Sequence, residues 1–364
     1  MQNKLSRAGM LVAVGIVSGG ATCQQNTFAK ITRSGATNTY RVVAFGDSIY
    51  AGYDKSLSLS SVARRSDPYV VGDYLATQWN ANIEVVRLTE SGATASQILA
   101  DEVNGYGSSY INGATRVAML DSCGNDFLQA RSSMNSQTGT CSLAPLDSAV
   151  TNCITNTKSS LAKINSLIAG VSALSGKKVT RLLMNLYYPG FAADNVNLGC
   201  TIGGVATNKQ TVFLDRLAQA NFQLCGAAEA AGWTCVDDFS HYMAADYDTN
   251  GDGVVDQVNA AYRGQGEGEA NYRNRINGYR TTILHDSKTK GAVVNGAHAS
   301  EDYLLTNDDT HPTYTGGTMS CTTGSPSSSS FAQDYTASPN SVWNVYGHER
   351  GGWQNRVILT GVSP

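Results

Sequence analysis

Short apolar runs alternate with longer helical patterns along most of the chain. Five runs rich in aliphatic and β-branched residues predict strands: 42–45, 83–88, 117–120, 179–186 and 234–236. Between them, apolar residues recur at helical spacing over about 146–174 and 210–231, and Gly232 is a suitable helix end. Because strands that alternate with helices form right-handed βαβ crossovers, we predict an α/β fold: a central parallel sheet in a three-layer α/β/α domain.

The first residues have the pattern of a secretory signal peptide. Lys4 and Arg7 precede the apolar stretch 10–17, which is too short to span a bilayer. Small residues follow, so we assign 1–29 to the signal, with cleavage after Ala21 or after Ala29. We therefore expect a secreted protein, periplasmic or extracellular.

Two further observations bear on the membrane and on nucleic acids. Lipid attachment at Cys23 is disfavoured, because the residues before it lack the leucine-led context of such sites. No later segment reaches the ~20 apolar residues of a membrane span, so we expect no transmembrane segment in the mature chain. The 364 residues carry a net charge of -3 and no basic patch, which argues against a nucleic-acid partner.

Eight cysteines suit an oxidising compartment, and none forms a Cys-x-x-Cys pair. We predict a bridge from Cys141 to Cys153, which would close a short polar loop. Cys200 could pair with Cys225 or with Cys235, because spacing alone does not decide connectivity. Cys123 is left open between a buried thiol and a bridge.

Four polar motifs follow separate elements of this pattern. Gly46-Asp47-Ser48 follows the first strand, Ser91-Gly92-Ala93-Thr94 the second and Gly124-Asn125-Asp126 the third, while Asp308-Asp309-Thr310-His311 lies in a late loop. Each motif alone has a simpler interpretation as a helix cap, a turn or a solvated acidic loop. Together they place chemistry-bearing residues at the carboxyl edge of the sheet, where ligands bind in open α/β folds.

On these four motifs the chain resembles the SGNH (GDSL) hydrolases, a family defined by Ser, Gly, Asn and His in four blocks in this order. The resemblance covers about 40–317. It implies a flavodoxin-like α/β/α fold and hydrolysis of carboxylic esters, with phospholipase or acyltransferase activity on the same site as the alternative. It implies no cofactor for catalysis, and a small-molecule, lipid or acylated-sugar ester as substrate. A secreted binding module that kept the fold is the non-enzymatic alternative.

The resemblance assigns a Ser-His-Asp triad. Ser48 would be the nucleophile and His311 the general base, which requires an imidazole that titrates near neutrality. Asp308 would orient the imidazole; Asp309 is the rival, and the family spacing selects Asp308. The oxyanion hole would combine the backbone N–H groups of Ser48 and Gly92 with the side-chain amide of Asn125.

The signatures of two other classes of serine hydrolase are incomplete in this chain. The chain holds no Gly-x-Ser-x-Gly elbow, so the α/β-hydrolase signature is missing. Ser160 and Lys163 fit a Ser-x-x-Lys pattern, but they lie mid-helix without the partner motifs of β-lactamases.

We expect a hydrolase domain over 38–320, with an insertion near 240–295, and a Ser/Gly-rich C-terminal tail over 321–364.

The insertion contains a calcium-like loop. Its oxygen ligands follow the EF-hand spacing, although the twelfth position is Asn259 rather than glutamate and no clean helix pair flanks it. An Asp/Asn/Gly-rich surface turn without metal is the alternative. We predict a structural Ca²⁺ held by Asp246, Asp248, Asn250, Asp252, Val254 and Asp256.

Overall fold

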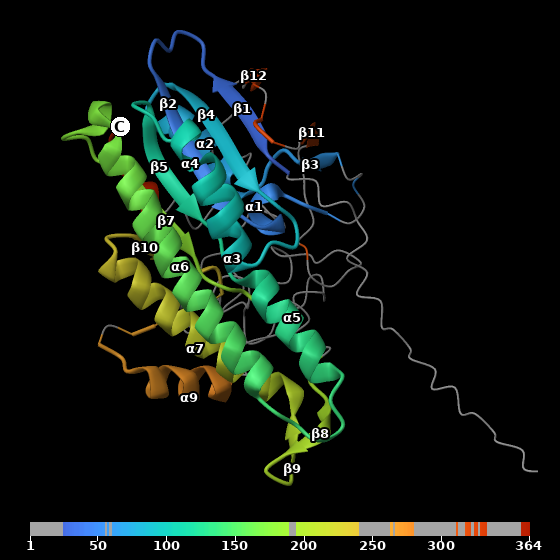
Figure 1. Cartoon of the computed structure of the whole chain (residues 1–364). Helices are drawn as coiled ribbons and strands as arrows, with labels where there is room; N and C mark the ends of the chain where they lie inside the picture. The colour runs from blue at the N-terminus through green and yellow to red at the C-terminus, as the bar shows by residue number, and fades with distance from the viewer. Residues whose placement is uncertain are drawn as a thin grey trace, which may run out of the picture.

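A computed structural model describes eleven stretches of the chain, which include nearly all of the predicted α/β core (Figure 1). The described residues are 25–54, 57, 60–188, 194–239, 263–264, 266–279, 311, 317–321, 324–326, 328–332 and 358–364.

A seven-stranded sheet in the order β10-β7-β5-β2-β4-β1-β12 forms the centre of the fold. Its strands are β1 (Thr27–Thr32), β2 (Thr39–Gly46), β4 (Asn82–Thr89), β5 (Thr115–Leu120), β7 (Thr180–Met184), β10 (Thr234–Val236) and β12 (Ser328–Ala332). All five predicted strands are present and pair in parallel, in the order 2-1-3-4-5 of flavodoxin-like folds. The strand order reverses between β2 and β5, so the switch point lies between the strands that precede Ser48 and Asn125.

Alternate residues of each strand enter two separate cores. Val43 and Phe45 face one core and Val42 and Ala44 the other, as the two-residue period of a strand requires. Both predicted helices are confirmed, as α6 and α7, and they cover the first face. The helices are α1 (Ser48–Ala51), α2 (Asp67–Gln78), α3 (Ala95–Gln97), the π-helix η1 (Ile98–Val103), α4 (Asn104–Tyr110), α5 (Gly124–Asn135), α6 (Ala144–Gly170), the 3₁₀ turn η2 (Ser172–Leu174), α7 (Lys209–Ala230) and α9 (Glu269–Tyr279).

The other face is covered by α1 and α2 together with the end of the chain. Leu359 is fully buried in this core, and the indole of Trp79 donates to the carbonyl of Val362 (2.6 Å). The predicted three-layer arrangement is therefore present, with helices on both sides of a mostly parallel sheet (Figure 1).

Two strands of the main sheet were not predicted. β1 lies antiparallel to β4, and its residues alternate between buried and half-buried positions. Its first three residues lie in the stretch assigned to the signal peptide, 1–29, so this alternation was not interpreted as a strand. β12, within the Ser-rich segment expected to be loop, pairs in parallel with β1. Its serines carry little strand propensity, so tertiary pairing decides its conformation.

Two smaller sheets flank this core. β3 (Ser61–Ala63) pairs with β11 (Thr318–Ser320), and β8 (Asn197–Ile202) lies between β6 (Gly139–Thr140) and β9 (Val205–Asn208). In the second of these sheets, Gly139 of β6 is opposite Cys200 of β8.

The disulfides differ from the predicted pairs. The bridges are Cys123–Cys153, Cys141–Cys200 and Cys225–Cys235. The predicted bridge between Cys141 and Cys153 is wrong, and so is either pairing of Cys200 with Cys225 or Cys235. The physical reason is that β6 and β8 bring Cys141 beside Cys200, while Cys153 of α6 faces the loop after β5.

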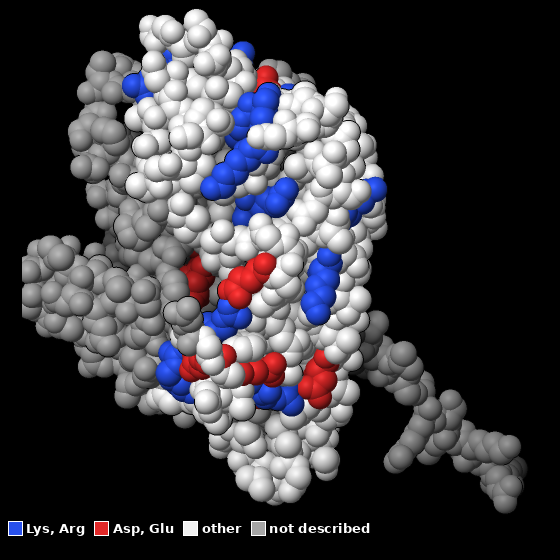
Figure 2. Space-filling view, turned by 90° about the vertical axis from the view of Figure 1, so that its left-hand side faces the viewer, with Lys and Arg blue, Asp and Glu red and all other residues white. Residues whose placement is uncertain are grey.

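The surface is mixed in charge over the face that forms the left-hand side of Figure 1. Basic side chains are spread over the upper part of this face, and acidic and basic ones alternate below them (Figure 2). Asp215 of α7 pairs with Arg216 and with Arg273 of α9, each at 2.6 Å, which ties α9 to the domain. In the part of the chain that the structure describes, no helix is both long and apolar enough to cross a membrane.

Candidate active site

Ser48 is the first residue of a one-turn helix, α1, directly after β2. Asp47 is its N-cap, and its Oδ1 accepts a hydrogen bond from the backbone N–H of Ile49 (2.9 Å). Gly52, at φ 76°, ends the helix in the left-handed conformation that glycine adopts without strain. The strand end, the cap and the terminal glycine together hold Ser48 at the carboxyl edge of the sheet, and only 5 % of its surface is exposed.

His311 lies against Ser48 although 263 residues separate them. Its Nε2 is 2.8 Å from Ser48 Oγ, within hydrogen-bond distance. The ring of Tyr53 packs edge-on against the imidazole, with 4.8 Å between ring centroids, and so limits its rotation. The serine and the histidine predicted from the sequence are thus brought together in the geometry of a nucleophile and its base.

Two sets of predicted residues lie outside the described part of the chain. Asp308, the predicted orienting residue, is one, and the calcium loop over 246–256 is the other. Among the residues that are described, no group of three or more His, Cys, Asp or Glu side chains could hold a metal ion.

Asn125 lies in the first turn of α5, directly after β5. Its Nδ2 donates to Asp47 Oδ2 (3.1 Å) and to the carbonyl of Ala93 (3.0 Å). Both neighbours are acceptors, so the amide nitrogen, and not its oxygen, must face them. Both N–H groups of Asn125 therefore point into the space between the first and second motifs.

Gly92 lies in the loop after β4. Its φ is 87°, a conformation that side-chain-bearing residues rarely adopt, and a Cβ there would meet no atom within 4 Å. Its backbone conformation, rather than crowding, therefore requires glycine. Asp126 joins this loop to α5, because its Oδ2 accepts from the N–H of Ala95 (2.8 Å). Burial raises the pKa of Asp126 to about 6.

Three buried carboxyl groups lie beneath Ser48. Asp47, Glu102 and Asp121 are each at most 2 % exposed. Burial raises the pKa of all three, and for Asp121 the repulsion of Asp47 raises it further. Glu102 Oε2 accepts from the N–H of Gly46 (3.0 Å), which anchors the end of β2. The site thus rests on acidic groups that burial biases toward the neutral form.

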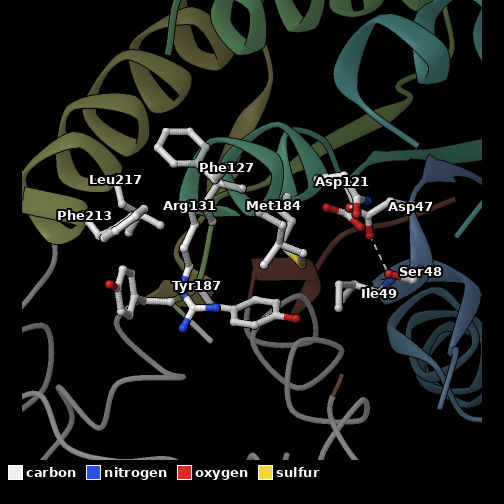
Figure 3. A pocket seen from close by; sticks show the side chains of 15 residues that line it. Asp47, Ser48, Ile49, Asp121, Phe127, Arg131, Met184, Tyr187, Phe213 and Leu217 are labelled. Carbon is white, nitrogen blue, oxygen red and sulfur yellow. Dashed lines mark hydrogen bonds between the residues drawn. The ribbon is translucent and has the colours of Figure 1, made fainter. Parts of the chain in front are cut away.

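A largely apolar pocket opens beside Ser48. Figure 3 shows Asp47, Ser48 and Asp121 at one end, Phe213 and Leu217 at the other, and Arg131 and Tyr187 between them. The pocket runs between α5, the end of β7 and α7, and its apolar and aromatic lining consists of Ile49, Phe127, Leu128, Met184, Leu186, Tyr187, Tyr188, Phe213 and Leu217.

One charged cluster borders this pocket. Asp194 has no exposed side-chain surface and accepts two hydrogen bonds from Arg131, each 2.8 Å long. Lys209 Nζ lies 2.5 Å from it, and the hydroxyl of Tyr188 donates to it (2.8 Å). Burial would raise the pKa of Asp194, but the hydrogen bonds from Arg131 and Lys209 outweigh it and hold that pKa below its ordinary value.

Sequence reasoning missed Asp121, Tyr53 and the Asp194 cluster. A signal existed for Asp121, since it directly follows the apolar run 117–120, and aspartate is rarely buried. Tyr53 and Asp194 lie in irregular segments whose contacts no periodicity reveals.

The family model of the GDSL-like lipase/acylhydrolases matches residues 42–316. No curated protein matches the chain significantly. Similar solved structures include a lipase from a goat rumen metagenome (17% identity, TM-score 0.42), which covers 57% of this chain and 86% of its own.

Two Streptomyces proteins are also similar in structure. The extracellular lipase of Streptomyces rimosus is 17% identical, with 56% of this chain and 82% of that one covered and a TM-score of 0.38. The phospholipase A1 of Streptomyces albidoflavus is 17% identical, with 66% and 98% covered and a TM-score of 0.35. Since the family model spans well over half of the 364 residues, the chain belongs to the GDSL-like lipase/acylhydrolase family and is a hydrolase that acts on esters.

Proposed function

We propose that this protein is a secreted lipase or carboxylesterase that cleaves esters of medium to long acyl chains through Ser48. The observation that carries the proposal is the 2.8 Å contact of Ser48 Oγ with His311 Nε2 at the mouth of an apolar pocket. Phe127, Leu128 and Leu217 line that pocket, and an acetyl group would leave most of this surface unused. The apolar lining thus supports a longer acyl chain.

The chemistry follows from the contacts of Ser48. His311 takes the proton of Ser48 Oγ as the oxygen attacks the ester carbonyl, which forms a tetrahedral oxyanion. The same imidazole returns the proton to the leaving alcohol, and water then hydrolyses the acyl-enzyme. Asp308, three residues before His311, orients the imidazole and stabilises its charged form.

The oxyanion would lie among the N–H groups of Ser48, Gly92 and Asn125. An oxyanion accepts a hydrogen bond more strongly than a neutral carbonyl does. When the oxyanion forms, one N–H of Asn125 therefore donates to it instead of to the carbonyl of Ala93. The other N–H continues to donate to Asp47. A phospholipase or acyltransferase would use the same residues, and the apolar pocket fits a phospholipid acyl chain equally well.

Labelling and substrate range test this function together. A fluorophosphonate probe should label the protein, and Ser48→Ala should abolish both the labelling and all ester hydrolysis. A panel of p-nitrophenyl esters from acetyl to palmitoyl, with phosphatidylcholine and acetylated xylan beside it, should show the highest kcat/KM above acetyl length. Labelling that survives in Ser48→Ala, or a preference for acetyl esters, would contradict the proposal.

Export fits the fold best if the signal is cleaved after Ala21. Cleavage after Ala29 would divide β1, whose residues 27–31 pair with β4. Mass spectrometry of the N-terminus of the mature protein decides between the two positions.

Calcium would have a structural role in the 240–295 insertion. The crowded carboxylates of Asp246, Asp248, Asp252 and Asp256 repel one another without a cation. Chelation should therefore lower the melting temperature in calorimetry, and Asp248→Ala should remove that sensitivity. Equal melting temperatures with and without chelator in the unaltered protein would show that the loop needs no metal.

A further inference from the structure

Asp121 is a buried acid for which the proposed mechanism has no use. It follows β5 directly, and its backbone N–H donates to the carbonyl of Phe45, which fixes it beside the end of β2, the strand that precedes the first motif. Its side chain lies against that of Asp47, and the two carboxyl groups are hydrogen bonded. Figure 3 shows both at the Ser48 end of the pocket.

Two glycines make room for this carboxyl pair. A Cβ at Gly46 would lie 2.9 Å from Cβ of Asp121, and a Cβ at Gly124 would lie 2.8 Å from Asp47 Oδ2. Neither distance is tolerated by real side chains. The close packing of Asp47 and Asp121 is therefore built into the backbone of the first and third motifs.

The environment does not allow both carboxyl groups to ionise. Both are at most 2 % exposed, and in the described part of the chain no lysine or arginine hydrogen-bonds to either. The charged and titratable groups that act on them are His311, Tyr50, Glu102, Asp126 and Asp238, and of these only His311 can carry a positive charge. Two carboxyl groups in contact under these conditions share one proton.

The partners of each group decide where that proton lies. Asp47 accepts from Ile49 N–H and from Asn125 Nδ2, which stabilise its anion. Asp121 accepts only from the backbone N–H of Asp47, and no described group donates a hydrogen bond to its Oδ2. Asp121 is therefore the proton carrier, and its O–H donates to Asp47.

We propose that Asp121 is a positioning residue for ester hydrolysis: its proton completes the donors around Asp47, and Asp47 in turn holds the Asn125 amide toward the oxyanion. The inference rests on the proposed roles of Ser48 and Asn125. The shared proton limits the pair to one negative charge. Loss of that proton would drive Asp47 and Asp121 apart, release Asn125 and set a second negative charge near the forming oxyanion.

Three variants separate this role from simple packing. Asp121→Asn keeps the shape and can donate an N–H to Asp47, but it carries no titrating proton. Asp121→Leu keeps the volume and removes the donor. Glu102→Gln is the matched control: it neutralises a neighbouring buried acid that contacts neither Asp47 nor Asn125 in any hydrogen bond described, and it keeps the acceptor for Gly46 N–H.

The readout is the pH profile of kcat and of KM on the best ester of the panel. The unaltered protein should lose kcat at alkaline pH as the pair loses its proton. Asp121→Asn should keep kcat at pH 7 within about threefold and lack this alkaline loss, while Asp121→Leu should lower kcat about tenfold at every pH with KM nearly unchanged. Glu102→Gln should keep the alkaline loss.

Three outcomes would overturn the inference: an unchanged alkaline loss in Asp121→Asn, an unchanged kcat in Asp121→Leu, or the same change in Glu102→Gln as in Asp121→Asn. Should Asp121→Leu fail to fold, as judged by circular dichroism, Asp121→Asn decides alone.

Infrared spectroscopy separates this inference from the proposed function. With Glu102→Gln as the background, so that Glu102 gives no band of its own, a protonated-carboxyl band that is lost on adding Asp121→Asn shows the shared proton even in a protein that hydrolyses no ester of the panel. A band that persists in this double variant would contradict the pair.

Discussion

Two buried carboxylate centres border the same pocket and behave in opposite ways. Asp47 and Asp121 lie together at the Ser48 end, where no lysine or arginine of the described residues hydrogen-bonds to them, and the pKa of both is raised. Asp194 is equally buried, yet Arg131, Lys209 and Tyr188 hydrogen-bond to it and its pKa is lowered. Burial therefore does not by itself determine ionisation; the partners decide whether a buried acid keeps its charge.

The two centres also stabilise different parts of the site: one the pocket wall, the other the position of the Asn125 amide. The Asp194 cluster joins α5, the segment before β8 and the start of α7, so its ion pairs hold the pocket wall in place. The Asp47–Asp121 pair joins the ends of β2 and β5 and holds the amide of Asn125. We accordingly expect changes at the first centre to alter stability and changes at the second to alter turnover.

The largest effect should come from Asn125→Ala. It removes an N–H from the oxyanion and leaves Asp47 without its amide donor, so kcat should fall about 10²–10³-fold, the cost of one oxyanion-hole donor in a protease. Because Ser48 and His311 remain, residual turnover should persist. Steady-state kinetics on the best ester measures this, and a change confined to KM would argue against the assigned role.

A smaller effect, measured on stability, should follow from Arg131→Met. The variant keeps much of the side-chain length but removes the two hydrogen bonds to Asp194, leaving Lys209 and Tyr188. Breaking a buried pair costs about 3–5 kcal/mol, and the remaining partners should reduce this to about 2 kcal/mol. Urea unfolding measures the loss. Lys163→Met, on the solvent face of α6, is the control and should change stability by less than about 0.5 kcal/mol.

The smallest effect should be a difference in how stability depends on pH. The folded pKa of Asp194 is depressed, so its contribution is present above the unfolded value of about 4 and is lost as the pH falls. The folded pKa of Asp121 is raised, so its contribution is present below that value and is lost as the pH rises toward its folded pKa.

Neutral variants test these opposite signs. Asp194→Asn should reduce the loss of stability on acidification, and Asp121→Asn should reduce the loss on alkalinisation. Thermal unfolding between pH 4 and pH 9 checks both. Parallel melting curves for Asp121→Asn and the unaltered protein would contradict a shared proton.

The sequence predicted the five core strands because each contains a short run of mostly apolar residues, and in β2, β4 and β5 most of these residues are buried. It missed β12, whose three serines have no such pattern and which exists only because β1 offers a free edge. It also placed Cys141 with Cys153, since the parallel pairing of β6 with β8 cannot be seen in residue spacing.

For the site, the sequence by itself determined which residues are candidates: Ser48, Gly92 and Asn125 stand in motifs after strands whose carboxyl ends meet at one edge, and His311 stands in a late loop. Only the tertiary structure decided how they are held. Three contacts join residues far apart in the chain: the 2.8 Å contact of Ser48 with His311, the edge-on packing of Tyr53 against the imidazole, and the packing of Asp121 against Asp47. Local pattern reports what a residue can do chemically, whereas desolvation and charge partners, which set its protonation and orientation, arise only when distant segments pack together.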